Sequence, residues 1–158
     1  SPGPVQPYSY RHDGKDLRYI GAWDVYPANR QRLVAALQSA KIGHPLITSA
    51  DVHSFWAMDG TLTPDSGERI PIPEFVSSSI SANWPEPLDQ PVRENLAHNP
   101  QVRLYEGDRR GYLLHEVTAT EWTTTMRAVD DVRNASSGIT DLARFVVRNG
   151  EPGFREVP

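Results

Sequence analysis

The chain has 158 residues, of which 38% are hydrophobic, and carries a formal net charge of −4 with a pI near 5.7. This size suits one domain with a moderate core. The acidic balance, and the lack of any basic run interleaved with aromatic residues, argue against a nucleic-acid partner. The chain has no cysteine, so a disulfide framework is excluded. No stretch approaches the roughly 20 apolar residues of a transmembrane helix.

The first part of the chain predicts an arm followed by a helix. Residues 1–22 are rich in proline, then polar, and follow no clear period, so we expect an extended arm; because the first residue is serine, we expect it to follow a processed or nicked terminus. Residues 23–43 predict a helix, since Pro27 suits the first turn and Gly43 is placed to end it. Its apolar stripe consists of Leu33, Val34, Leu37 and Ala40.

Two metal-capable side chains follow a short apolar run. Residues 44–48 predict a buried strand and residues 54–58 a second one, with Asp51 and His53 between them. If the extended backbone continues past residue 48, these two side chains lie on the same face and could reach one ion. For an isolated pair the alternative is structural: Asp51 caps a turn and His53 packs with a satisfied ring nitrogen.

The remainder of the chain is dominated by strand signals. We expect a loop or hairpin tip at 60–73, a strand at 74–82, a mostly irregular segment at 83–101 with one or two helical turns near 92–97, three strands joined by tight turns within 102–132, and a last strand at 141–153. In the third strand, alternate residues from 122 to 128 predict a half-exposed antiparallel sheet. The predicted fold is therefore α/β or α+β, with one helix and mostly strands.

Five segments resemble a known family in order and spacing. They are WDVYPANRQRL, ITSADVHSFWA, EFVSSSISA, the block from NPQVRLYEGD to TMRAVDDV, and LARFVVRNGEPG, which together span residues 23–153. They resemble the C-terminal third of the PhoD-type alkaline phosphatases. The resemblance implies a calcineurin-like metallophosphoesterase, an αββα sandwich of which this chain forms the C-terminal portion. It also implies Fe³⁺ and Ca²⁺ at the site and hydrolysis of phosphomonoesters or phosphodiesters, with phospholipase D activity among the relatives.

The same resemblance suggests roles for particular residues. Asp51 and His53 fall on the family's metal-bearing motif; His53 is either a ligand or the group that orients the phosphate or protonates the leaving alcohol. Phe55 and Trp56 could line the substrate mouth, although buried aromatics after a strand more often belong to the core. The family usually has glycine where this chain has Ala50, which puts a positive φ at that position in doubt.

The resemblance also predicts the organisation of the whole protein. Residues 23–158 would be the C-terminal part of the catalytic domain, active only with a larger N-terminal chain that holds the remaining ligands. We expect a secreted or extracytoplasmic enzyme that acts on a phosphoester, which could be a phospholipid. The chain alone should be poorly folded. The alternatives are a non-catalytic β-rich binding module, or a regulatory role in which residues 1–22 or the 60–73 loop cover the site.

Overall fold

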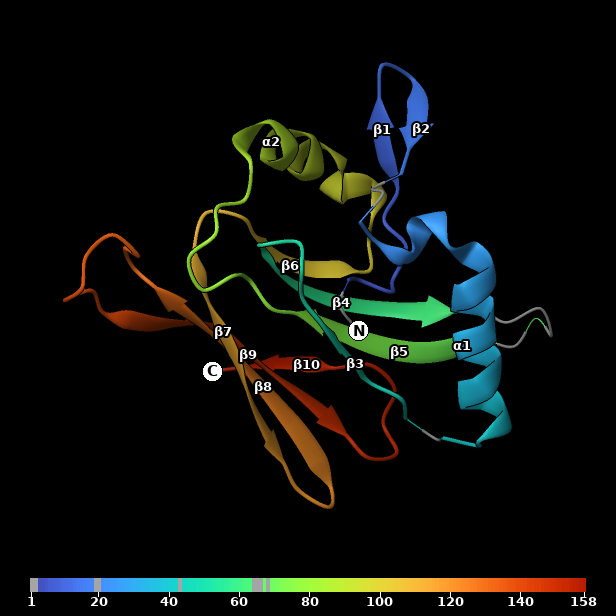
Figure 1. Ribbon diagram of the computed structural model, residues 1–158. Helices are drawn as coiled ribbons and strands as arrows, with labels where there is room; N and C mark the ends of the chain where they lie inside the picture. Colours follow the sequence, from blue (N-terminus) through green and yellow to red (C-terminus); the bar gives the residue numbers. More distant parts are fainter. Residues whose placement is uncertain (1–2, 19–20, 43, 64–66, 68) are drawn as a thin grey trace.

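The computed structural model describes residues 3–18, 21–42, 44–63, 67 and 69–158, and has the mixed α+β composition that was predicted, with strands in the majority (Figure 1). The described helical elements are η1 (Trp23–Val25), α1 (Pro27–Ser39), α2 (Glu86–Asn95) and η2 (Leu96–His98). The described strands are β1 (Tyr10–His12), β2 (Lys15–Leu17), β3 (Ile47–Ser49), β4 (Phe55–Leu62), β5 (Ile70–Val76), β6 (Val102–Glu106), β7 (Arg110–Val117), β8 (Glu121–Val129), β9 (Ile139–Arg148) and β10 (Arg155–Val157).

Two four-stranded sheets form the centre of the structure, in the orders β3-β5-β4-β6 and β10-β9-β8-β7, and β1 and β2 make a separate hairpin (Figure 1). Strand β3 is parallel to β5, whereas β4 is antiparallel to both β5 and β6. Side chains from the two sheets meet in one apolar cluster, in which Phe75 of β5 stacks on Phe145 of β9 with ring centroids 5.6 Å apart. The two sheets therefore form a β-sandwich with its core between them.

The two α-helices cover the other face of the sheet that contains β4 and β5. Val34 of α1 packs with Leu62 and Ile72, and Val92 of α2 packs in a second cluster with Trp56 and Met58. This arrangement follows from the period of a strand, because successive residues of β4 point alternately to the partner sheet and to the helices. The described layers are thus helix, sheet and sheet.

The N-terminal residues are part of this packing. Val5 and Gln6 are almost completely buried, and their backbone N–H groups donate to the carboxylate of Glu74 on β5, at 2.9 Å and 2.7 Å. Ser49 also donates its hydroxyl to Glu74, at 2.6 Å, and burial raises the pKa of that carboxyl group. Only after this anchored stretch does the hairpin of β1 and β2 project from the sheets (Figure 1). Whether 1–22 is a unit separate from 23–158 stays a prediction.

The structure refines the predicted elements in three places. Residues 83–101 are not mostly irregular, since α2 and η2 occupy 86–98 with Pro91 inside the helix. The three strands expected within 102–132 are present and belong to two sheets, because β6 pairs with β4 while β7 pairs with β8. The predicted strand at 74–82 begins earlier and ends at Val76.

The half-exposed pattern expected for β8 is also wrong. Thr123 and Thr125 are as buried as the core-facing Thr124, with exposures of 5%, 6% and 0%. Strand β8 lies between β7 and β9, and an ion pair joins Arg144 to Glu116 at 3.6 Å across it. The long side chains of the neighbouring strands therefore cover the short threonines.

The remaining local expectations can be compared directly. The predicted loop at 60–73 is the end of a hairpin, since β4 continues to Leu62 and β5 begins at Ile70; residues 64–66 and 68 lie outside the described residues. Gly43, the predicted end of the first helix, lies outside them too. Helix α1 ends at Ser39, and Lys41 then adopts a left-handed backbone with φ 52°.

Candidate functional site

The segment from Asp51 to His53 is a sharp bend and not a continuation of strand β3. Asp51 has φ 76° and His53 has φ 53°, so both lie in the left-handed region, which Asp and His tolerate better than most residues. Ala50, whose backbone was in doubt, is not among the described residues with positive φ. The prediction that extended geometry aligns the two side chains is therefore wrong, because the strand stops at Ser49.

Burial nevertheless separates the two potential ligands from the residue between them. Asp51 is exposed and His53 is half-buried, whereas Val52 is only 4% exposed and belongs to the cluster beneath helix α2. The bend thus turns Val52 into the protein and leaves Asp51 and His53 toward its outer side.

The imidazole of His53 is held by one backbone group. Its Nδ1 lies 3.1 Å from the carbonyl oxygen of Asn83, in the segment before α2. Since a carbonyl can only accept, Nδ1 must carry the proton in this contact. In the neutral ring the lone pair is then on Nε2, which is the form in which histidine binds a metal ion.

The backbone of the bend is held by a buried arginine that sequence reasoning missed. Arg110, at the start of β7, is only 5% exposed, and its Nη1 donates to the carbonyl oxygen of His53 and to Ser78 Oγ. Its Nη2 donates to the carbonyl oxygen of Gly107 at 2.7 Å. Ser78 Oγ also contacts the His53 carbonyl, at 3.2 Å. Burial lowers the pKa of this guanidinium, although acidic residues nearby, first among them Asp108, oppose the effect.

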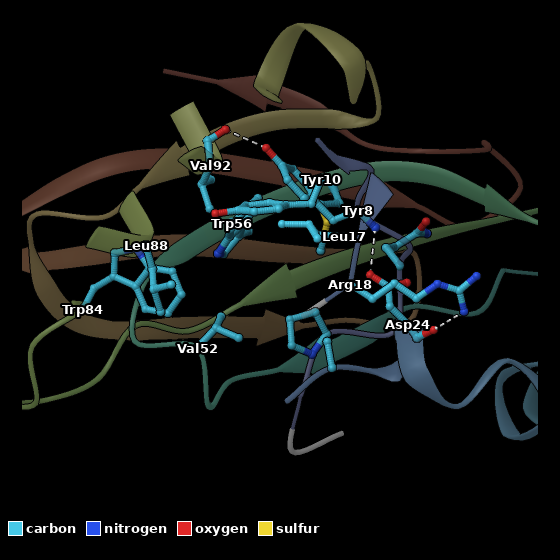
Figure 2. A pocket seen from close by; sticks show the side chains of 14 residues that line it. Tyr8, Tyr10, Leu17, Arg18, Asp24, Val52, Trp56, Trp84, Leu88 and Val92 are labelled. Carbon is cyan, nitrogen blue, oxygen red and sulfur yellow. Dashed lines mark hydrogen bonds between the residues drawn. The ribbon is translucent and has the colours of Figure 1, made fainter. Parts of the chain in front are cut away.

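The two aromatic residues after the bend separate into different environments. Phe55 is completely buried between the sheets, where the structural alternative places it. Trp56 points the other way and lines a cavity of about 250 Å³ (Figure 2). The walls of this cavity also include Tyr8, Tyr10, Leu17, Val52, Trp84, Leu88 and Val92. A role in substrate binding stays a prediction for both aromatic residues.

The metal-capable side chains of the described residues are scattered over the fold. Among the described residues, no group of three or more His, Cys, Asp or Glu side chains could hold an ion. Asp51 and His53 offer carboxylate and imidazole, donors that suit Fe³⁺, and a carboxylate also suits Ca²⁺. The two side chains are therefore of types that bind Fe³⁺ or Ca²⁺, but two residues do not complete the coordination sphere of either ion.

The fold and the bend define a layered α+β domain that presents a potential pair of metal ligands at the end of a parallel strand. The chain belongs to the PhoD-like phosphatase family, whose pattern matches residues 5–126. This range includes the whole Asp51–His53 bend and most of the sandwich, and stops within β8.

Two individual proteins show how far the likeness extends. Alkaline phosphatase D of Bacillus subtilis (strain 168) is 29% identical over 144 residues, which cover 87% of this chain and 24% of that protein. A solved structure described as the structure of PhoD has a TM-score of 0.79 at 24% identity, over 99% of this chain and 30% of that one. The chain thus spans less than a third of the length of either relative. None of its described helices is long and apolar enough to cross a membrane.

Proposed function

We propose that this chain is the C-terminal portion of a metal-dependent phosphoester hydrolase that cleaves phosphomonoesters or phosphodiesters, phospholipids being one candidate substrate. The observation that carries the proposal is the Asp51–His53 bend, with its two metal-capable side chains outward and Val52 inward, inside the residues that match the PhoD-like phosphatase family. Ligands of α/β sheets bind outside the carboxyl ends of the strands, and these two donors follow the carboxyl end of the parallel strand β3.

Each residue of the bend has a distinct role in this proposal. The Asp51 carboxylate is a metal ligand. His53 binds through Nε2, since its Nδ1–H is engaged by the Asn83 carbonyl oxygen. In the alternative, the ring carries a proton on both nitrogens, and the Nε2–H group orients the phosphate or protonates the leaving alcohol. Fe³⁺ and Ca²⁺, as the family resemblance suggests, would supply Lewis acidity and lower the pKa of a bound water. Arg110 keeps the His53 backbone in place through its carbonyl oxygen.

The remaining ligands would come from a larger N-terminal part of the protein, and the assembled enzyme would act outside the cytoplasm. Two observations support the first statement. Among the described residues, no third His, Cys, Asp or Glu side chain joins Asp51 and His53 in a group that could hold an ion. In the described sheet, strand β3 is hydrogen-bonded on one side only, to β5. Strands in parallel pairing are normally buried inside a sheet, so a further strand beside β3 is expected.

The test uses the longest natural form of the protein that contains this chain. We expect Asp51→Asn and His53→Ala each to lower bound iron or calcium, measured by elemental analysis, and to lower hydrolysis of p-nitrophenyl phosphate and of its bis-ester by about 10²-fold or more. Asp13→Asn is a matched control, because Asp13 is also an exposed aspartate with positive φ, 50°, but lies at the tip of the β1–β2 hairpin. Unchanged metal content and turnover in both variants would refute the proposal.

The second candidate is a non-catalytic β-rich binding module. It is favoured by the same observation, that no three His, Cys, Asp or Glu side chains among the described residues are grouped so as to hold an ion. Elemental analysis of the unaltered protein separates the two functions, since the module would contain neither iron nor calcium and would hydrolyse neither ester.

A further inference from the structure

The cavity lined by Trp56 lies between the β1–β2 hairpin, helix α2 and the helix-facing side of β4 (Figure 2). Two tyrosines from the N-terminal segment surround that ring. Tyr8 meets Trp56 edge-on with ring centroids 5.2 Å apart, and Tyr10 lies 6.4 Å from Tyr8 in a tilted pair. Because aromatic rings prefer edge-on and tilted neighbours, a wall of this kind suits a further ring.

Several polar groups of the wall already have partners within the protein. The Tyr8 hydroxyl donates to the carbonyl oxygen of Val92 at 2.7 Å. Asp24 accepts a hydrogen bond from the Tyr8 backbone at 3.2 Å and pairs with Arg30. Arg18 donates to the Asp24 carbonyl oxygen at 3.0 Å (Figure 2). What remains for a ligand is mainly ring and aliphatic surface.

The electrostatic surroundings favour a neutral ligand. Burial is the main effect that raises the pKa of the Tyr8 and Tyr10 hydroxyls, so an ionised group is penalised here. The charged side chains in the described wall are Arg18 and Asp24, one of each sign. The wall therefore offers no excess charge that would offset the burial of an ion.

The size and position of the cavity limit its occupant further. Its volume of about 250 Å³ exceeds that of engineered cavities of about 150 Å³ that bind benzene. Of the bend, only the inward-pointing Val52 lines the cavity, whereas Asp51 and His53 do not. A ligand in the cavity would therefore contact the hairpin and helix α2 and would leave Asp51 and His53 free for the phosphoester.

We propose that this cavity binds a neutral aromatic molecule of one or two fused rings, other than the phosphoester, which holds the β1–β2 hairpin against helix α2. The inference goes beyond the proposed hydrolysis and does not depend on it. Leu17 of the hairpin and Leu88 of the helix line the cavity and are 42% and 37% exposed, so they form part of its rim. Both can be replaced by polar residues without loss of core.

Calorimetry with indole tests the proposal on the longest natural form of the protein that contains this chain. It compares the unaltered protein with Leu17→Gln/Leu88→Gln and with Leu114→Gln. Leu114 is a matched control, because it is 43% exposed and lies on β7, in the other sheet. We expect saturable indole binding that weakens about tenfold in the double variant only, since two apolar contacts are lost. Indole-3-carboxylate and phenyltrimethylammonium should bind the unaltered protein at least tenfold more weakly than indole.

Hydrogen exchange measures the effect on the two elements. With saturating indole, we expect the amides of β1, β2 and α2 to exchange at least fivefold more slowly, because the ligand contacts both sides of the cavity, while those of β8 and β9 stay unchanged. If circular dichroism shows that the double variant is unfolded, Leu88→Trp replaces it. This substitution keeps the wall apolar but narrows the cavity, and should also weaken indole binding about tenfold.

Several outcomes would overturn the proposal. These are no indole binding, equal binding in the unaltered protein and the folded cavity variant, or tighter binding of either charged probe. Displacement of indole by inorganic phosphate would overturn it too, since the ligand would then compete with the phosphoester. Unchanged exchange in β1, β2 and α2 with indole bound would show that the ligand does not hold these elements together. An absence of phosphoester hydrolysis would refute the proposed function alone, because calorimetry measures indole binding without turnover.

Discussion

At the scale of single residues, the bend shows how a strained backbone is retained. A left-handed backbone at a residue other than glycine costs about 1–3 kcal/mol, and the bend has two such residues within three positions. Contacts from three separate segments hold it: the Asn83 carbonyl on the His53 ring, Ser78 and Arg110 on the His53 carbonyl. Such strain clusters at functional sites, which agrees with the role proposed for Asp51 and His53.

Arg110 gives a prediction at this scale. We expect Arg110→Met to lower the free energy of unfolding by about 1–3 kcal/mol, because the carbonyl oxygens of His53 and Gly107 would lose their donor while buried. Arg110→Lys should keep part of that stability but lower kcat about tenfold with little change in KM, since one ammonium group cannot reach both sets of acceptors as a planar guanidinium does.

Arg109 is the matched control for this pair of variants. It is the exposed neighbour of Arg110, and its side chain makes a long ion pair, 4.0 Å, with Glu106. Arg109→Met and Arg109→Lys should change neither stability nor kcat appreciably. Thermal unfolding and steady-state kinetics measure both effects, and equal behaviour of the two arginines would show that Arg110 does not position the bend.

The candidate site was only partly predictable from these residues. The spacing of Asp51 and His53 identified the pair, but positive φ at an aspartate and a histidine has no signature in the surrounding residue types. Arg110 was missed because the run from Asp108 to Arg110 reads as a solvated turn. Only the fold distinguishes the buried Arg110 from the exposed Arg109.

At the scale of elements, the sequence predicted the helices and strands whose residues show a clear period or are bounded by turn residues. Helix α1 and the strands β4, β7 and β9 have the expected periodicity or turn residues. Helix α2 was missed because Pro85, Pro87 and Pro91 punctuate it, although Pro85 is the N-cap and Pro87 lies in the first turn, where proline is tolerated. The separation of β6 from β7 into different sheets depends on pairing between distant segments, which local propensity does not report.

Glu74 links two elements and yields a prediction about pH. Burial raises its pKa above the ordinary value of 4.5 and outweighs the hydrogen bonds from Ser49, Gln6 and Val5 that lower it. The folded state therefore holds this proton more tightly than the unfolded state, so its contribution to stability is present below pH 4.5 and is lost as pH rises through the raised pKa. We expect the unfolding midpoint of the unaltered protein to fall, relative to that of Glu74→Gln, as pH increases from 4 to 8.

The comparison with Glu74→Gln removes the effects of all other titrating groups that the two proteins share. Glu121→Gln is the control, because Glu121 is half-buried at the start of β8 and its nearest cation, Arg148, is 3.7 Å away. A difference that is constant with pH, or one that favours the unaltered protein as pH rises, would contradict the raised pKa.

At the scale of the whole molecule, one edge strand of a described sheet adjoins the proposed site. Strands β8 and β9 each have a neighbour on both sides, and so do β4 and β5, whereas β3 is an edge strand in the described sheet. The bend with the two proposed ligands follows this edge strand directly. If a larger N-terminal part completes the enzyme, we expect one of its strands to pair with the open edge of β3. A strand parallel to β3 would end beside the bend, so ligands that follow it would lie near Asp51 and His53.

Hydrogen exchange tests this arrangement by comparing the 158-residue chain with the longer natural form. In the chain alone, we expect the amides of β3 and of residues 50–54 to exchange at least tenfold faster than in the longer form, because an open edge lowers the free energy of local opening. The amides of β8 and β9 should be the best protected in both forms, since each strand is paired on both sides. Gel filtration and circular dichroism accompany the measurement, with the chain alone expected to be loosely folded. A cooperative, compact monomer whose β3 amides are as protected alone as in the longer form would mean that no further strand pairs with β3.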